Sequence, residues 1–433
     1  MSIAENKDNP PSGDAGNTSD ATVETGREEK TAHEFGEAPD GGLRAWLVAI
    51  GAAFITFASM GFANSFGVFQ EYYMTHQLRG RSADTIAWIG SLTAFFQFFA
   101  GAIGGPLFDR YGAWLIRPAT ILCVFATMMV SLCDEYWQFI LAQGLLLGLT
   151  MGFMQFPAFA AVAQFFDKKR AAALGLAVAG SSVGGVVFPI ALSKMLNSSS
   201  LGFGWSVRII AFVMLPTLGF SCFTVRARLP PRPTNFFIAT AFKQVDFILL
   251  VAALLFMFLG MMTPLFFIPT YAVTKGMDAT LASYLLAILN AASTFGRIIP
   301  GIMADKFGRT NILALGGIST GVVILCLTKA ESTAALVVYS VFFGFVSGTI
   351  ISGGSAALTG CVKDPRDIGT YMGTGLSISS IAVLIGPPIN GRLEHVYGGF
   401  FEVSIFSGVM CLVGGLIAFV SKVGTSHGIL GRT

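Results

Sequence analysis

Residues 105–112 read GPLFDRYG and residues 301–308 read GIMADKFG, so one eight-residue pattern occurs twice, 196 positions apart. Each copy lies between two long apolar runs. A set of small residues repeats at an offset of 200: Gly144, Gly148 and Gly152 correspond to Gly344, Gly348 and Ser352. Repeats that keep their order along a chain indicate two halves with one shared architecture.

The apolar runs indicate a membrane protein. Of the 433 residues, 54% are hydrophobic and 12% are charged, whereas a soluble domain carries roughly 25% charged residues. A helix that crosses the hydrocarbon core of a bilayer needs roughly 20 apolar residues. Twelve runs of about this length cover residues 45–70, 86–108, 113–132, 137–163, 171–193, 203–225, 246–272, 280–303, 310–328, 332–359, 367–391 and 400–421. We therefore predict an all-α membrane protein with twelve transmembrane helices in two pseudo-symmetric halves of six.

The segments outside the runs define the predicted domains. The first 39 residues are rich in Asp, Glu, Ser, Thr and Gly and have no apolar core, so they do not resemble a signal peptide. The prolines at 230, 231 and 233 oppose a helix between the sixth and seventh runs. We predict a disordered cytosolic tail at 1–39, a six-helix half at 40–226, a cytosolic linker at 227–243, a second half at 244–422 and a short cytosolic tail at 423–433.

The distribution of Lys and Arg predicts the orientation in the membrane. Loops on one side carry thirteen Lys and Arg residues, against six on the other, or seven if Arg208 is counted there. Because cytoplasmic loops carry the excess of basic residues, both termini are expected in the cytosol. We expect the plasma membrane, with the vacuolar membrane or another endomembrane as the alternative. In a predicted outer loop, residues 197–199 read NSS, which makes Asn197 a candidate glycosylation site.

Composition also argues against other classes of function. The net charge is +3, and the basic residues form short clusters instead of a continuous face, so nucleic acid is not expected as a partner. The six cysteines show no CxxC spacing, and the four histidines are scattered through tail and loop regions. Neither a metal site nor a catalytic dyad is visible. We expect no enzyme activity and no cofactor.

The repeated pattern G-x-x-x-D-R/K-x-G resembles the signature of the major facilitator superfamily, and the resemblance extends over roughly residues 40 to 425. It implies transport by alternating access, with the charged residues of the two motifs holding the halves together in one state. In the chain's own chemistry, the glycines allow tight turns and close helix approach, and the charges can pair with neighbours and helix ends. The implied gating residues are Gly105, Asp109, Arg110, Gly112, Gly301, Asp305, Lys306, Gly308 and Arg309.

Two further segments resemble the monocarboxylate-transporter branch of that superfamily. Residues 40–46 read DGGLRAW before the first run, and residues 165–181 read FFDKKRAAALGLAVAGS at the start of the fifth. Residues 204–210, GWSVRII, are similar to fungal members of the branch. Some of those are carboxylate or vitamin permeases, and others are encoded in secondary-metabolite gene clusters as exporters. The resemblance does not separate the two.

Arg297 is the main candidate for substrate binding. It lies eight residues before Asp305, which at about 1.5 Å per residue places it roughly 12 Å into the membrane. A charge at that depth is costly, so it is a functional candidate by default. The resemblance implies that Arg297 pairs with a substrate carboxylate, and a guanidinium suits a planar carboxylate. The alternative is an arginine that bonds backbone carbonyls as a packing device.

The polar residues near Arg297 are neutral. Proton-coupled members of the branch have an acid where this chain has Ser293 and a Lys where it has Asn64, so we expect weak proton coupling. We assign Ser293, Asn64, Asn290 and Gln155 to the substrate site, with helix-to-helix hydrogen bonding as the alternative. For four other amides, packing is the favoured interpretation: Gln97, Gln143, Gln164 and Asn390.

The basic cluster Lys168, Lys169 and Arg170 either helps to hold or release an anion on the cytosolic side or is ordinary positive-inside charge. Taken together, the sequence predicts a secondary transporter for a small organic anion, such as a monocarboxylate or a related carboxylated metabolite. The alternatives are an exporter of a fungal secondary metabolite and, less favoured, a non-transporting nutrient sensor. The expected partners are the small molecule and the lipid bilayer. A monomer is compatible with the sequence, which identifies no accessory subunit.

Overall fold

The computed structural model describes residues 36–197, 200–231 and 238–423. The chain divides into two compact units, residues 1–37 and 38–433, and the fold below is that of the second unit. The predicted N-terminal tail lies almost wholly outside the described residues, as do the central part of the linker and the end of the C-terminal tail.

In the described residues all regular structure is helical. The first half contains α2 (Gly42–Ala58), α3 (Met60–Ala63), α4 (Phe66–Thr75), α5 (Ala83–Phe99), α6 (Gly101–Tyr111), α7 (Ile116–Val130), α8 (Tyr136–Phe139), α9 (Gly148–Phe165), α10 (Arg170–Asn197) and α11 (Gly202–Thr224). The second half contains α12 (Val245–Thr274), α13 (Ala279–Phe307), α14 (Arg309–Leu325), α15 (Thr333–Leu358), α16 (Ile368–Tyr397) and α17 (Phe401–Val423). Short 3₁₀ turns are η1 (Gly112–Leu115), η3 (Ala239–Lys243), η4 (Leu327–Lys329), η5 (Thr359–Cys361) and η6 (Pro365–Asp367), and η2 (Ile140–Leu147) is a π-helix.

The helices make twelve membrane crossings. Eleven helical stretches of the described chain are long and apolar enough to cross a membrane, and one of them, Thr85–Val130, has 46 residues. At about 1.5 Å per residue such a stretch is more than twice as long as the hydrocarbon core is thick. The chain reverses within it at Gly112, where φ is 73°, so α5 and α6 make one crossing and α7 makes the next. The predicted all-α fold with twelve transmembrane helices is confirmed.

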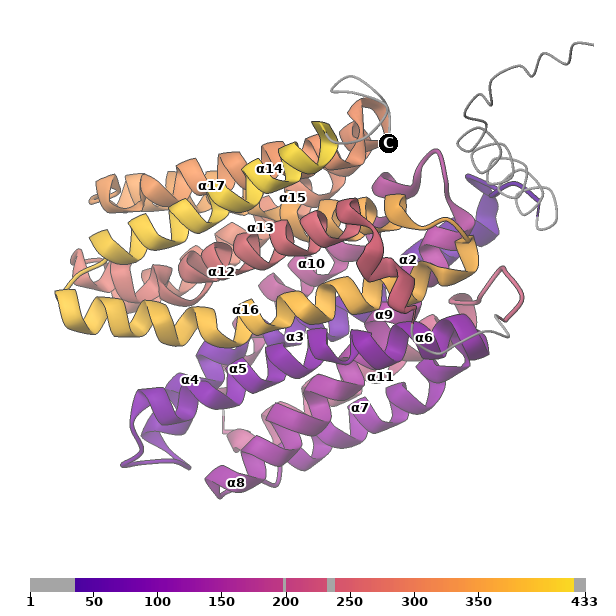
Figure 1. The fold of residues 1–433 in the computed structure, drawn as a ribbon. Coiled ribbons are helices and arrows are strands. Elements are labelled where there is room, and N and C mark those ends of the chain that lie inside the picture. The colour runs from indigo at the N-terminus through magenta and orange to yellow at the C-terminus, as the bar shows by residue number, and fades with distance from the viewer. Residues whose placement is uncertain (1–35, 198–199, 232–237, 424–433) are drawn as a thin grey trace, which may run out of the picture. The chain divides into compact units, whose positions relative to one another are not determined.

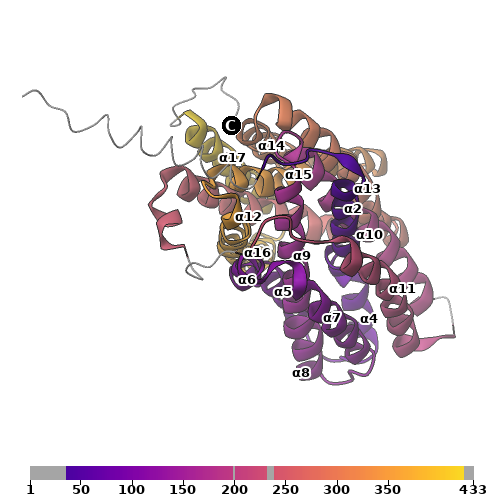
Figure 2. The ribbon, with the colours of Figure 1, turned by 90° about the vertical axis from the view of Figure 1, so that its right-hand side faces the viewer.

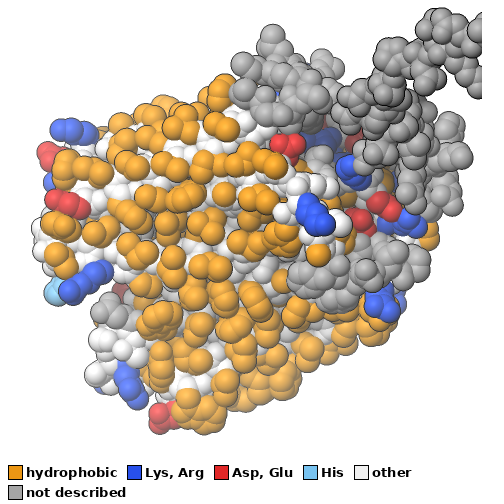
Figure 3. Space-filling model, in the orientation of Figure 1, with side chains coloured by type: hydrophobic (Ala, Val, Ile, Leu, Met, Phe, Trp, Pro, Cys, Tyr) orange, Lys and Arg blue, Asp and Glu red, His pale blue; other side chains and the backbone are white. Residues whose placement is uncertain are grey.

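The surface of the unit is that of a protein in lipid. Hydrophobic side chains cover its lateral face, and charged side chains gather mostly toward the two ends (Figure 3). Large apolar side chains point outward, among them Ile121, which is 71% exposed, and Phe223, which is 76% exposed. Exposed apolar area on this scale is stable in hydrocarbon and not in water.

The two halves lie side by side, the first drawn in indigo to magenta and the second in rose-red through orange to yellow (Figure 1). Helix α6 packs against α16 on one side of the bundle, and α10 packs against α13 on the other (Figure 2). Both contacts use glycine: a Cβ atom added to Gly105 would overlap the carbonyl of Gly369, and one added to Gly175 would overlap the carbonyl of Arg297. Because glycine has no side chain, the backbones of the opposite halves can touch at these positions.

Both repeated motifs lie at one end of the bundle, which we call the motif end. The linker is attached there through Arg228, whose Nε donates to the carbonyl of Gln164 at 2.7 Å. The Gln164 side chain in turn accepts the backbone N–H of Arg228 at 3.0 Å. Desolvation lowers the pKa of the Arg228 guanidinium from its ordinary value. Gln164 therefore has the packing role that the sequence suggested.

Candidate substrate cavity and gate

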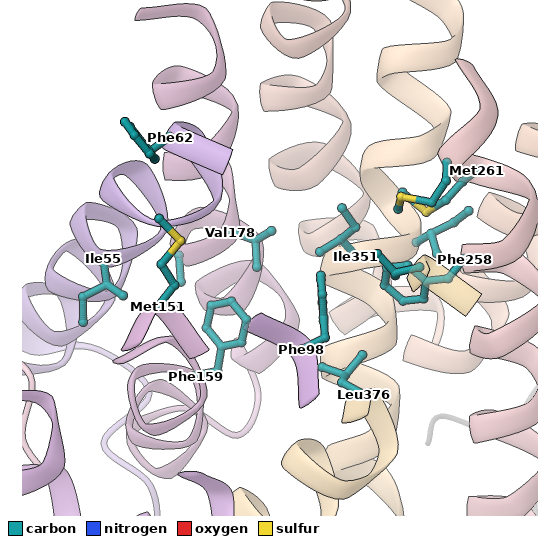
Figure 4. Packing of buried hydrophobic residues seen from close by; sticks show 14 of the residues in the cluster. Ile55, Phe62, Phe98, Met151, Phe159, Val178, Phe258, Met261, Ile351 and Leu376 are labelled. Atoms are coloured by element: carbon teal, nitrogen blue, oxygen red, sulfur yellow. The ribbon is translucent and has the colours of Figure 1, made fainter. Parts of the chain in front are cut away.

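A cavity lies between the two halves. Its volume is about 190 Å³. Its walls come from α3, α4, α5 and η2 of the first half and from α12, α13, α15 and α16 of the second. Most of the wall is apolar, with Met60, Phe62, Phe66, Phe98, Phe258, Met261, Met262 and Phe266. Of these, Figure 4 shows Phe62 on the side of the first half, Phe258 and Met261 on the other side, and Phe98 between them.

Irregular helix geometry borders the cavity in the first half. The first crossing is interrupted at Ser59, between α2 and α3, and again at Asn64 and Ser65, between α3 and α4. The π-helical segment η2 contains Gln143, which lies on the wall. π-helical segments are often found at functional sites because they redirect side chains.

Arg297 lies on the cavity wall and also joins the two halves. It is only 5% exposed. From α13, its Nη1 donates to the carbonyl of Val178 on α10 at 2.9 Å and contacts the Ser181 hydroxyl. Its Nε has no hydrogen-bond partner. Among the described residues that line the cavity, Arg297 is the only charged one. The bond to the Val178 carbonyl agrees with the packing interpretation of this residue, and its binding of a substrate stays a prediction.

The predicted neutral residues of the second half lie beside Arg297 on the wall. Asn290 and Ser293 line the cavity together with Asn64 of the first half. The Asn64 Nδ2 donates to Asn290 Oδ1 at 3.3 Å, and Asn290 Nδ2 donates to the Leu286 carbonyl at 2.9 Å. The structure therefore brings four of the five predicted binding residues to one cavity.

The fifth predicted residue, Gln155, is not on the wall. It lies on α9, and its side chain is fully buried. Gln97 of α5, which lines the cavity, donates its Nε2 to Gln155 Oε1 at 2.8 Å. Gln97 and Gln143, which the sequence assigned to packing, do line the cavity. Gln143 accepts the Tyr73 hydroxyl at 2.8 Å.

Sequence reasoning missed part of the wall. Gly90, Thr93, Ala94 and Gln97 of α5 all line the cavity. Their spacing of three, four and seven residues places them on one face of a helix. That periodicity was visible in the sequence. The sequence does not show how α5 is rotated about its axis, and this rotation decides whether the face points toward the cavity or toward lipid.

The aspartate of the first motif contacts the opposite half. Asp109 is only 4% exposed. Its carboxylate accepts the backbone N–H of Gly369 at 3.0 Å, and the N–H and hydroxyl of Thr370 at 2.6 and 2.7 Å. These groups belong to the first turn of α16. A helix N-terminus has unpaired N–H groups and a positive end of the helix dipole, so it stabilises a carboxylate.

The aspartate of the second motif repeats this contact with the halves exchanged. Asp305 of α13 accepts the N–H groups of Ala171 and Ala172, in the first turn of α10, at 2.9 and 2.8 Å. Arg309 Nε also lies 3.8 Å from Asp305 Oδ1. No Lys or Arg nitrogen in the described chain lies within 4.0 Å of the Asp109 carboxylate. Both aspartates thus bind the first turn of a helix in the opposite half, but among the described residues only Asp305 also has a cationic side chain nearby.

The other motif residues are turns or surface charges. Gly112 and Gly308 have φ values of 73° and 96°, which disfavour any residue with a Cβ atom. Arg110 and Lys306 are exposed, and the Arg110 guanidinium lies 5.7 Å from the ring centre of Tyr111. Gly301 packs against Ala171 of α10.

The two segments that resemble the monocarboxylate branch contact each other. The Asp40 carboxylate accepts the backbone N–H of Asp167 at 2.7 Å and that of Lys169 at 3.2 Å. Arg309 of the second half donates to the Asp167 carbonyl in the same loop. Lys168 and Lys169 are exposed, and Arg170 pairs with Asp167 at 3.1 Å. None of these residues lines the cavity.

The candidate glycosylation site lies at the last residue of α10. Asn197 Nδ2 is 3.5 Å from Ser193 Oγ. The remaining sequon residues, 198 and 199, lie outside the described residues. Glycosylation of Asn197 stays a prediction.

Comparisons with known proteins agree with this architecture. Residues 51–328 and 291–429 match the Major Facilitator Superfamily. The chain is 49% identical to the aspyridones efflux protein apdF of Emericella nidulans, over 89% of this chain and 79% of that protein. It is 41% identical to the agnestins efflux protein AgnL12 of Paecilomyces divaricatus, over 89% of each. It is 40% identical to the fujikurins efflux protein of Gibberella fujikuroi, over 90% of this chain and 85% of the other.

Solved structures share the fold. The human organic anion transporter MFSD10 has a TM-score of 0.67 at 15% identity, covering 87% of this chain and 100% of its own. The transporter FucP in the outward conformation has a TM-score of 0.64 at 17% identity, covering 87% and 99%. The named relatives are efflux proteins, and membership of the monocarboxylate-transporter branch stays a prediction. The chain belongs to the Major Facilitator Superfamily, and it is a multi-pass membrane transporter and not an enzyme.

Proposed function

We propose that this transporter exports a fungal secondary metabolite by alternating access. The observation that carries the proposal is the cavity between the halves, whose wall is mostly apolar, with eight phenylalanine and methionine side chains, and also carries neutral amides and hydroxyls and the guanidinium of Arg297. Such a wall suits a ring compound with few polar groups, because apolar area supplies affinity and a few polar groups supply orientation. The efflux names of relatives that are 40 to 49% identical support the same direction of transport.

The proposed cycle uses the two motif contacts as a gate. With Asp109 bound to the start of α16 and Asp305 bound to the start of α10, the halves are joined at the motif end. The excess of Lys and Arg supports a cytosolic location for that end. In the proposed cycle both contacts break before the cavity takes up substrate from the cytosol, and both form again as the cavity opens on the other side. The plasma membrane is the proposed site.

The narrower substrate proposal concerns acidic metabolites. The unpaired Nε of Arg297 supports binding of a carboxylate or another acidic group, since an unpaired buried N–H gains a charge-assisted hydrogen bond there. Uptake of a simple monocarboxylate is the second candidate function, and the guanidinium is the observation that favours it. The apolar wall favours the larger metabolite.

Export from intact cells tests the proposal. The protein would be produced in a yeast strain that lacks its own drug exporters, and the cells would be loaded with aspyridones, the compounds named for the 49%-identical relative. We expect faster loss of the compounds from these cells than from cells with an empty vector. Accelerated uptake of lactate or pyruvate, with no effect on aspyridone efflux, would favour the second function and contradict the first.

A further inference from the structure

A pair of glutamine side chains on one side of the cavity is bonded differently from the two asparagines there. Gln97 lies on the wall, and in the described chain its only hydrogen bond is the one that its Nε2 donates to Gln155 Oε1 at 2.8 Å. Gln155 is 0% exposed, and its own Nε2 has no partner. The pair therefore leaves one amide group unpaired behind the wall and one oxygen, Gln97 Oε1, unpaired at the wall.

This pair has a second arrangement of almost the same shape. The oxygen and nitrogen of a glutamine amide are nearly equal in size, so a half-turn of both amides exchanges donor and acceptor without moving other atoms. Gln155 Nε2 would then donate to Gln97 Oε1, and Gln97 would present its Nε2 to the cavity. Each arrangement contains one hydrogen bond and one unpaired buried group. Neither is strongly preferred before a substrate binds.

The two neighbouring asparagines, Asn64 and Asn290, do not share this freedom. Asn290 donates to the Leu286 backbone carbonyl at 2.9 Å, and a carbonyl can only accept, so the orientation of the Asn290 amide is set. Asn64 follows from it, because Asn64 Nδ2 donates to the oxygen that Asn290 leaves free. In the described chain, the side chains of the Gln97–Gln155 pair make no hydrogen bond to a backbone group.

We propose that Gln97 is a specificity-determining residue that offers the substrate either a hydrogen-bond acceptor or a donor. Gln155 is a positioning residue: its amide accepts from Gln97 in the first arrangement and donates to Gln97 in the second. The proposal rests on the export function proposed above and names the ligand class: planar, mostly apolar ring compounds with either one N–H or O–H group or one carbonyl group. One site can then accept metabolites of opposite hydrogen-bonding character.

Three probes of matched shape test the proposal on the purified protein in lipid nanodiscs. Carbazole has only an N–H donor, 9-fluorenone has only a carbonyl acceptor, and fluorene has neither. Equilibrium binding is measured for each. Because a hydrogen bond adds roughly 1 kcal/mol, we expect carbazole and 9-fluorenone both to bind about fivefold more tightly than fluorene. If only one of them exceeds fluorene, the amide has a fixed orientation and the proposal is wrong.

Substitutions assign the effect to the pair. Gln97→Met should reduce both polar probes to the affinity of fluorene and leave fluorene unchanged. Gln155→Met should weaken both polar probes by a smaller factor, and the double variant should be no weaker than Gln97→Met alone, because Gln155 acts only through Gln97. If the losses of affinity in the two single variants add up in the double variant, or if fluorene binding is lost, Gln155 is merely structural.

Gln164→Met is the matched control, since Gln164 is a buried glutamine on the same helix that binds the linker and not the cavity. It should bind all three probes as the unaltered protein does. The probe comparison on the unaltered protein needs no substitution, so it decides the matter even if a variant fails to fold. Binding is independent of export: failed aspyridone efflux with the expected probe pattern would reject the proposed function alone, and the reverse result would reject this inference alone.

Discussion

In the proposed mechanism Arg297 has two roles, substrate binding and contact between the halves. One nitrogen of its guanidinium binds the Val178 carbonyl of the opposite half, and its buried Nε has no hydrogen-bond partner. A buried cation is stable only when its hydrogen bonds are largely satisfied. An acidic substrate would complete the set, and its departure would leave the guanidinium bound to α10 alone. If Arg297 binds the substrate as proposed, substrate binding and contact between the halves involve the same side chain.

We predict that Arg297→Ala abolishes export of acidic metabolites, with at least a tenfold loss of rate, while the protein still inserts and folds. Arg297→Lys should not restore affinity, because an ammonium lacks the planar fork of a guanidinium. Efflux from loaded cells measures the rate, and detergent-solubilised chromatography checks folding. Arg226→Ala is the control, since Arg226 is an exposed residue outside the cavity. Full efflux by the Ala variant would remove Arg297 from the mechanism.

The site also shows what sequence reasoning can and cannot reach at the level of single residues. Arg297, Asn290 and Asn64 were predictable because a charge or amide inside an apolar run has few explanations, and Ser293 because the resemblance implies an acid at its position. Gln155 was assigned to the substrate site and Gln97 to packing, whereas in the structure Gln97 lines the cavity and Gln155 does not. Both are amides in apolar runs, so only the rotation of α5 against α9 decides which one faces the cavity.

At the scale of elements, the number of crossings followed from run length and the repeat, because a bilayer sets a minimum length for each helix. The breaks at Ser59 and Asn64 and the π-helical segment η2 did not follow. Nothing in those residues forbids a regular α-helix, and the irregular geometry depends on packing between helices. The helix-terminus contacts of Asp109 and Asp305 were foreseen only as one of several options for paired charges.

Close approach of α6 and α16 should be sensitive to a single methyl group. In Gly105→Ala the new Cβ would overlap the Gly369 carbonyl, so we predict a weaker contact at the motif end and slower transport. Gly104→Ala is a matched control one residue away, because its Cβ would meet no atom closer than 3.4 Å. Val178 is buried between the halves beside Arg297. Labelling of a Val178→Cys reporter by an impermeant maleimide, added on the side of the motif end, therefore measures opening at that end. Equal labelling in both backgrounds would contradict the prediction.

The carboxylate contacts at helix N-termini make a related prediction. Asp109→Asn keeps an oxygen that accepts hydrogen bonds but removes the charge that α16 stabilises. We expect the population open at the motif end to rise about fivefold, since a carboxylate at a helix N-terminus contributes roughly 1 kcal/mol. The same cysteine reporter measures the change, and Asp364→Asn, a residue that caps the short turn η6 outside the contact, is the control. An unchanged labelling rate would show that Asp109 does not hold the gate.

At the scale of the whole molecule, the absence of carboxylates from the cavity wall predicts how transport is driven. Among the described residues that line the cavity, none is Asp, Glu or His, so no group there exchanges protons near neutral pH. We predict that efflux down a metabolite gradient in proteoliposomes changes less than twofold when a proton gradient is imposed. Strong accumulation driven by acid on one side would contradict this and would direct attention to Asp109 and Asp305.

The two halves repeat one design, yet Asp305 has Arg309 beside it and Asp109 has only neutral donors within 4.0 Å in the described chain. Salt screens an ion pair more than it weakens a hydrogen bond to a buried N–H group. A rise in ionic strength at that face should therefore loosen the α10 side earlier than the α16 side. Opening would then occur in two steps. Pre-steady-state measurements of opening at the motif end would show an intermediate in which the Asp305 contact with α10 is broken and the Asp109 contact with α16 is still formed.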